Sequence, residues 1–250
     1  MHNSLSETTQ NVLKPVDVLL NIRLTNVTEI KVIQEVISFI DTKCSLHKDK
    51  IYPASVAALI LNSENLPSLY ATSSRGYNNQ RLKFQDQYGV KVREELLPWA
   101  IDRVLKIESA SLSLSETTIN LTQNASKKFD IFEVLANIDL ANVTEFQVIE
   151  EAFNHIRNNY PKAVGIINLS DVCALTLNHQ DVPSFYATSA SAYDRLKQTY
   201  KSQFQPQVSS IIQRVVAKVH AEGSEHSISQ DSLISVNYQR RNRLTKSWNY

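Results

Sequence analysis

The feature of this sequence that most constrains its fold is an internal duplication. Residues 58–73 (ALILNSENLPSLYATS) and 174–189 (ALTLNHQDVPSFYATS) are identical at ten of sixteen positions, at an offset of 116 residues. The tetrapeptide Asn-Val-Thr-Glu recurs at the same offset, at 26–29 and 142–145. This period is far longer than the roughly 20–50 residues of a solenoid repeat, and each copy has the size of a small domain. The chain is therefore expected to fold as two similar domains.

The position of the duplication divides the chain into five segments. A Ser/Thr/Asn-rich stretch between the copies is typical of a linker, and the last residues have no counterpart in the first copy. The predicted segments are a polar N-terminal segment (1–13), domain one (14–108), the linker (109–127), domain two (128–220) and a basic C-terminal tail (221–250).

A scarcity of glycine narrows the fold class. The 250 residues include four glycines, whereas an average chain of this length holds roughly 17. No Gly-rich phosphate-binding loop occurs, and few hairpin turns that need a positive φ can form. Large β folds and Gly-loop nucleotide folds are therefore disfavoured, and we expect an all-α protein. Gly76 and Gly89 correspond to Ala192 and Gln205, so no glycine geometry is common to both copies. Nucleotide binding through side chains stays open.

Apolar residues recur at helical spacing in both copies. Asn26 and Asn142 precede one such run each and are followed three residues later by a glutamate, which predicts an N-cap and a capping-box acid. A short helix is predicted at about 54–63 and 170–179, and each ends at an asparagine. The proline that follows each short helix predicts an extended segment at 66–73 and 182–189.

The apolar pattern in the last part of each copy predicts one long helix with an interruption. Gly89 lies beside the position equivalent to Pro206, so each copy carries a helix breaker near one point. This predicts a kink or two successive helices there, and Pro98 predicts a second bend in the first copy. We expect the two domains to pack face to face about a pseudo-two-fold axis, as an intrachain pseudo-dimer.

Several blocks resemble the late-competence ComFB family, most closely its cyanobacterial members, and several of these blocks occur in the same order in both copies. The blocks are residues 24–30, the ALxLN core of the short helix, the LPxxYATS segment, and Gly76 with Gln80. The resemblance covers about 17–107 and 133–220. It implies a small, mostly helical, dimeric fold and a role as a receptor for cyclic di-GMP or cyclic di-AMP.

Candidate ligand-binding residues follow the short helix in each copy. Hydroxyls and arginines beside an extended segment can hold phosphates, and tyrosines can stack on bases. The alternative is that the tyrosines pack in the core and the arginines begin exposed helices. The resemblance adds an acid at the family's Glu position, which can bind a guanine edge or serve as a first-turn helix acid. The predicted ligand-binding residues are Tyr70, Ser73, Ser74, Arg75, Arg81, Asp171, Tyr186, Ser189 and Arg195.

The sequence departs from the family pattern at two places. An arginine that opens the short helix in cyanobacterial members is absent from both 51–56 and 167–172. Its planar fork suits guanine recognition. Because the two copies differ from each other, we expect at most one competent site. Some members also carry a zinc-binding cysteine cluster. Here Cys44 and His47 supply only two of the four ligands that a structural zinc needs, so no metal or cofactor is predicted. Cys173 is expected to be buried.

The remaining signals concern the class and location of the protein. None of the six histidines belongs to a recognisable catalytic motif, so we predict no enzyme activity. The absence of a signal-like or membrane-spanning apolar run predicts a cytoplasmic protein. The basic tail can contact nucleic acid, anionic lipid or protein, or be a solvated terminus, and nothing marks a folded nucleic-acid module.

Two functional hypotheses follow. The first is a non-catalytic regulatory protein that senses a cyclic dinucleotide and signals to a protein partner. The second is a degenerate ComFB-like interaction or scaffold module without ligand binding, which the missing arginine favours.

Overall fold

The computed structural model describes residues 22–44, 51–64, 66–112, 135–222 and 242. The predicted N-terminal segment, His47, most of the predicted linker and nearly all of the basic tail lie outside the described residues. Helix ends reach slightly beyond the predicted domains: the last helix of the first repeat continues to Leu112 and that of the second to Glu222.

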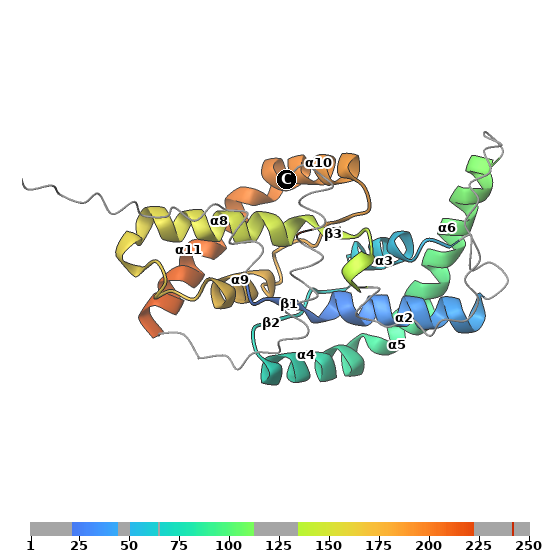
Figure 1. Ribbon diagram of the computed structural model, residues 1–250, viewed down its shortest axis with the longest axis horizontal. Coiled ribbons are helices and arrows are strands. Elements are labelled where there is room, and N and C mark those ends of the chain that lie inside the picture. Colours follow the sequence, from blue (N-terminus) through green and yellow to red (C-terminus); the bar gives the residue numbers. More distant parts are fainter. Residues whose placement is uncertain (1–21, 45–50, 65, 113–134, 223–241, 243–250) are drawn as a thin grey trace, which may run out of the picture.

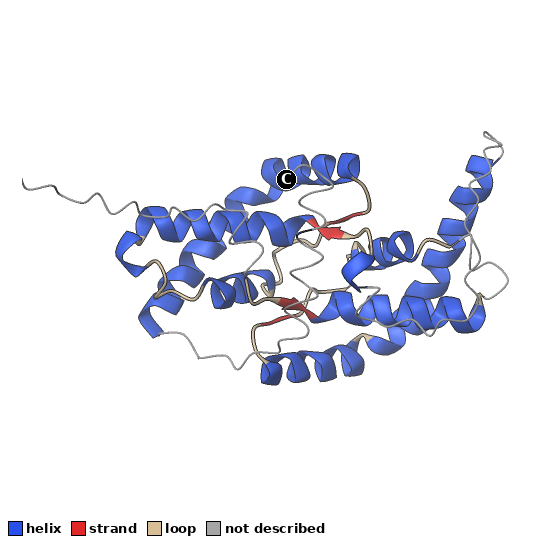
Figure 2. Cartoon of the chain, in the orientation of Figure 1, coloured by secondary structure: helices blue, strands red, loops and turns tan. Residues whose placement is uncertain are grey.

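The described part of the chain is all-α apart from two pairs of two-residue strands (Figures 1 and 2). The first repeat consists of β1 (Thr25–Asn26), α2 (Val27–Lys43), α3 (Pro53–Leu61), β2 (Tyr70–Ala71), α4 (Ser74–Gln87), α5 (Gly89–Lys91), the π-helix η2 (Val92–Leu96) and α6 (Leu97–Leu112). The second consists of β3 (Ala141–Asn142), α8 (Val143–Asn159), the 3₁₀-helix η3 (Pro161–Ala163), α9 (Leu169–Leu177), β4 (Tyr186–Ala187), α10 (Ala190–Thr199), the π-helix η4 (Tyr200–Phe204) and α11 (Gln205–Glu222).

The first long helix of each repeat begins at the predicted asparagine cap. The side-chain oxygen of Asn26 accepts a hydrogen bond from the Glu29 backbone N–H at 3.1 Å, and Asn142 does the same for Glu145 at 3.0 Å. Each cap satisfies one backbone donor that the helix start would otherwise leave without an intrahelical partner. The repeated tetrapeptide is therefore confirmed as a helix start.

The predicted extended segments contribute one strand to each small antiparallel pair. In the first repeat Thr25 pairs with Ala71 and Asn26 with Tyr70; the second repeat has the same register, 116 residues later. A threonine fixes the approach to the first pair, because the Thr28 hydroxyl accepts from the Leu69 N–H at 3.0 Å and donates to the Pro67 carbonyl at 2.9 Å. The segment after each short helix is thus tied to the start of the first long helix of its own repeat.

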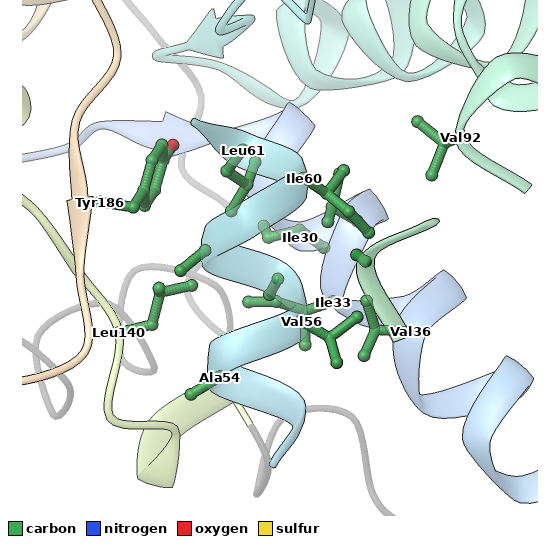
Figure 3. Close-up of a cluster of buried hydrophobic side chains, with 14 of the residues drawn as sticks. Ile30, Ile33, Val36, Ala54, Val56, Ile60, Leu61, Val92, Leu140 and Tyr186 are labelled. Carbon is green, nitrogen blue, oxygen red and sulfur yellow. The ribbon is translucent and has the colours of Figure 1, made fainter. Parts of the chain in front are cut away.

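The hydrophobic cores show that the repeats exchange side chains. Ile22, Leu24 and Tyr70 of the first repeat pack into the core of the second, and the corresponding Ile138, Leu140 and Tyr186 pack into the core of the first. Figure 3 shows Leu140 and Tyr186 beside α3, with Tyr186 next to Leu61. Burying one such side chain contributes about 1.5–3 kcal/mol. The expected intrachain pseudo-dimer is confirmed, and Figure 1 shows α2, α3 and α6 on one side of the strand pairs and α8, α9 and α11 on the other.

The predicted interruptions of the long helix are confirmed, and their causes differ between the repeats. In the first repeat the helix breaks at Tyr88, which has non-helical dihedrals (φ −125°, ψ −19°), just before Gly89. Each repeat also contains one π turn, and the residue that donates its closing hydrogen bond directly precedes a proline: Leu97 N–H bonds the Val92 carbonyl, and Gln205 N–H bonds the Tyr200 carbonyl. A proline lacks the N–H for the next α-type bond and its ring clashes with the carbonyl four residues back, so Pro98 and Pro206 account for the two π turns.

The π turn of the first repeat shifts the buried face of α6. A π turn holds one more residue than an α turn, so the residues that follow it are rotated relative to an unbroken helix. Val92 corresponds to Val208 at the usual offset of 116, but after the π turn the buried residues correspond at an offset of 115. The shifted pairs are Leu97 with Ile212, Ile101 with Val216 and Val104 with Val219.

Candidate functional site

Two tyrosines and two asparagines meet at the centre of the pseudo-dimer. The Asn26 amide nitrogen lies 3.0 Å from the Tyr70 hydroxyl oxygen and 2.6 Å from that of Tyr186. The Asn142 amide nitrogen lies 3.0 Å from the Tyr186 hydroxyl and 2.6 Å from that of Tyr70. The two distances within a repeat are thus equal to each other, and so are the two distances between repeats, as a two-fold axis requires. We call these four side chains the central tetrad.

Burial keeps the tetrad tyrosines protonated. Burial raises the pKa of the Tyr70 hydroxyl well above its ordinary value, and the nearby negative charge of Glu145 raises it further. Burial likewise raises the pKa of Tyr186, with Glu29 as the next contribution. Both glutamates are themselves buried in the first turn of a long helix. The centre of the molecule is therefore a polar core of neutral phenols, amides and first-turn acids.

The backbones of the two tyrosines are also held across the repeats. The Tyr70 N–H donates to Asn178 Oδ1 at 2.7 Å, and Asn178 Nδ2 donates to the Tyr70 carbonyl at 3.0 Å. Asn62 makes the same pair of bonds to Tyr186, at 2.7 and 3.0 Å. The side-chain amide of asparagine carries an acceptor, Oδ1, beside a donor, Nδ2, so it can accept from the N–H and donate to the carbonyl of one residue, as a neighbouring strand would. The asparagine that ends each short helix thus joins it to the other repeat.

These contacts locate Tyr70 and Tyr186 among the predicted ligand-binding residues. Each is only 2 % exposed, and its ring lies in the core of the opposite repeat. Of the two roles that the sequence leaves open for them, the structure has the packing role. Their backbones and hydroxyls fix the position of the Thr-Ser residues that follow, which lie nearer the surface.

Asp171 lies against the first repeat, although it belongs to the second. Its carboxylate oxygen accepts a hydrogen bond from the Thr72 hydroxyl at 2.9 Å. One residue earlier, the Ser170 hydroxyl accepts from the Arg23 backbone N–H at 3.1 Å. Arg23 and Thr72 therefore both lie against the start of α9, and Ser73, Ser74 and Arg75 follow Thr72 directly in the sequence. We define the first cross-repeat edge as Arg23, Thr72, Ser73, Ser74, Arg75, Ser170 and Asp171.

The opposite side of the molecule carries the pseudo-symmetric counterpart. The β3–β4 pair has the same register as β1–β2, and Asp139 precedes β3 as Arg23 precedes β1. The start of α3 takes the place that α9 holds on the other side. We define the second cross-repeat edge as the corresponding residues Asp139, Thr188, Ser189, Ala190, Ser191, Ala54 and Ser55.

The other predicted residues are distributed over the two edges and the helices that leave them. Ser73 caps α4 by accepting from the Gly76 N–H at 3.1 Å, and Ser189 caps α10 by accepting from the Ala192 N–H at 3.3 Å.

Ser74 is half-buried and Arg75 exposed in the first turn of α4, at the first edge. Arg81, half-buried, lies further along α4, where its charge contributes to a lowered pKa of Lys31 after the larger effect of burial. Arg195 is exposed on α10.

The structure therefore places Asp171 against Thr72, the residue directly before Ser73, Ser74 and Arg75, whereas Ser189 and Arg195 belong to the start and body of α10, on the opposite side (Figure 1). Four residues that make cross-repeat hydrogen bonds are not among those predicted from the sequence: Asn62, Asn178, Arg23 and Ser170. Asn62 and Asn178 occupy equivalent positions, so the same residue type recurs in both copies, and this recurrence is the only hint of a shared role that the sequence offers. An asparagine that ends a helix explains the recurrence equally well.

The sequence predicts neither a metal site nor a membrane-spanning segment, and the described residues bear on each point as follows. Cys44 is half-buried, and burial raises the pKa of its thiol, whereas Cys173 is buried in α9 as expected; neither is in a disulfide bond. Across the residues that the structure describes, no three His, Cys, Asp or Glu side chains gather into a set that could hold a metal ion. Within the same residues, none of the helices combines the length and apolar character needed to cross a membrane.

Two homologous helical repeats that close on each other around a shared polar centre define a tandem-repeat protein built as a dimer within one chain. The family described as "Late competence development protein ComFB" matches this sequence twice, over residues 25–106 and 141–222. These matches cover well over half of the sequence, so the chain belongs to the ComFB family, as its resemblance to that family indicated. ComFB is not a known family of enzymes. No curated protein and no solved structure matches the chain.

Proposed function

We propose that the chain is a non-catalytic cytoplasmic regulator that senses a cyclic dinucleotide, cyclic di-GMP or cyclic di-AMP, and signals its bound state to a protein partner. The observation that carries the proposal is the hydrogen bond from Thr72 to Asp171. It holds the acid at the family's Glu position against the Thr-Ser-Ser-Arg segment of the other repeat. Hydroxyl, guanidinium and carboxylate groups of this kind bind phosphates and base edges.

The same geometry supports a way to transmit the bound state. A ligand at a cross-repeat edge touches both repeats at once, so it binds the closed pseudo-dimer better than any arrangement in which the repeats separate. Such a ligand stabilises the closed arrangement in proportion to the logarithm of its concentration above Kd. A partner that contacts both repeats would then respond to the nucleotide.

Calorimetric titration of the full chain with cyclic di-GMP and cyclic di-AMP tests the proposal, with GMP and AMP as controls. We expect heat of binding and a raised Tm with at least one cyclic dinucleotide, and neither effect with the mononucleotides. Affinity capture of a partner should then depend on the cyclic dinucleotide. Absence of heat and of a thermal shift with both cyclic dinucleotides would overturn the sensing function.

The alternative is a ComFB-like scaffold module without ligand binding, and one observation favours it. Both predicted base-stacking tyrosines are buried and hydrogen-bonded within the pseudo-dimer. Because the family's arginine is absent as well, the chain has fewer groups for a base than a typical receptor. Specific capture of a protein partner, unchanged by either cyclic dinucleotide, would support this function over the first.

A further inference from the structure

The two cross-repeat edges share a backbone plan but differ in their side chains. Thr72 and Ser73 are matched by Thr188 and Ser189, so both edges present the same pair of hydroxyl-bearing residues. Every other defined position differs between them. These differences decide what kind of ligand each edge can hold.

Charge is the largest difference. Arg23 and Arg75 of the first edge correspond to Asp139 and Ser191 of the second. Both arginines and Asp139 are exposed. With Asp171 included, the first edge carries a formal charge of +1 and the second −1. A guanidinium pairs with phosphate through two parallel N–H donors, whereas a carboxylate at the matching position repels it.

Hydrogen bonding across the repeats is the second difference. The first edge is held by the Arg23–Ser170 and Thr72–Asp171 bonds, at 3.1 and 2.9 Å. At the second edge the residue matching Ser170 is Ala54, whose side chain has no acceptor, and a serine replaces Asp171. The first edge therefore has fixed polar groups where a ligand would bind, and preorganisation of this kind lowers the cost of binding.

We propose that the first cross-repeat edge is the single nucleotide site of the chain, that it binds one phosphodiester-bearing ligand per chain, and that Arg23 and Arg75 contact the phosphates. The inference rests on the proposed function. It assigns the site to residues of both repeats, and it makes Arg23, which lies before the first long helix, a binding residue. The second edge keeps the backbone plan without the ligand.

Titration of the full chain with cyclic di-GMP, and in parallel with cyclic di-AMP, tests the inference through stoichiometry. We expect one binding event per chain. Arg23→Asp, which introduces the charge of the second edge, and Arg75→Ser, which introduces its side chain, should each weaken binding about tenfold or more, because each removes a charge-assisted contact. Affinity should also fall as salt is raised.

Matched control variants at the second edge are Asp139→Asn and Ser191→Ala, and both should leave affinity unchanged. All four positions are exposed, so unaltered far-ultraviolet circular dichroism and Tm are expected and confirm that each variant folds. Two ligands per chain, or normal affinity in both arginine variants, would overturn the one-edge assignment while leaving the sensing function in place. No binding of either nucleotide by the unaltered chain would overturn the sensing function, and the site with it.

Discussion

At the scale of single residues, Asn26 and Asn142 each perform two tasks with one amide. The oxygen caps a helix within the repeat, and the nitrogen donates to tyrosine hydroxyls of both repeats. The first task could be predicted from sequence, because a cap depends on neighbours three residues apart. The second could not, since it joins residues up to 160 positions apart, and sequence spacing carries no record of that contact.

Removal of one tetrad hydroxyl tests whether the polar centre stabilises the fold. Tyr70→Phe leaves the ring in place but takes the acceptor from the amide nitrogens of Asn26 and Asn142. We expect a loss of about 1–3 kcal/mol in the free energy of unfolding, the usual cost of leaving buried donors without a partner. Urea denaturation measures this loss, and Tyr52→Phe, at a ring that is 62 % exposed, is the control with no expected change. A stability equal to that of the unaltered chain would mean that the tetrad is dispensable.

At the scale of elements, the helix breakers could be predicted from the sequence, but the shift of the buried face of α6 that accompanies one of them could not. Pro98 and Pro206 predict bends wherever a helix continues through them. The one-residue shift of the buried face of α6 depends on where the π turn falls, and core packing decides that. Periodicity could not detect the shift, because Leu96 and Leu97 are both apolar and either can continue the stripe.

If the π turn is a one-residue insertion, it can be removed. Deletion of Glu94 combined with Pro98→Ala should turn η2 into a regular α-helical turn and keep Leu97, Ile101 and Val104 in the core. We expect stability within about 1 kcal/mol of the unaltered chain. Deletion of Asp102, beyond the π turn, is the matched control: it rotates the following residues by about 100° and turns Val104 out of the core, so it should destabilise by about 1.5–3 kcal/mol. Chemical denaturation compares the two, and equal losses would contradict the insertion.

At the scale of the whole molecule, the duplication predicted two helical domains about a pseudo-two-fold axis, and this is the architecture observed. The exchange of Ile22 and Leu24 for Ile138 and Leu140 was beyond the reach of the sequence. We call the segments 22–24 and 138–140, which precede the first long helix of each repeat, the arms. The apolar pattern of an arm is the same whether it packs on the core of its own repeat or on that of the other. For the same reason, Asp171 could be identified as a candidate but not assigned to the segment of the opposite repeat.

The exchanged arms make a strong prediction about the halves of the chain. Cleavage at a protease site inserted into the predicted linker (109–127) should leave the two halves bound together, because each core contains side chains from the other half. We expect the cleaved protein to elute from a sizing column at the volume of the intact chain. Residues 135–222 produced alone lack the arm that fills their core, but the interface is self-complementary, so they should form a homodimer in which identical arms exchange. Light scattering measures the mass of each species. Two halves that separate on cleavage, each folded and monomeric, would show that the repeats are independent domains and that the arm exchange contributes nothing to their stability.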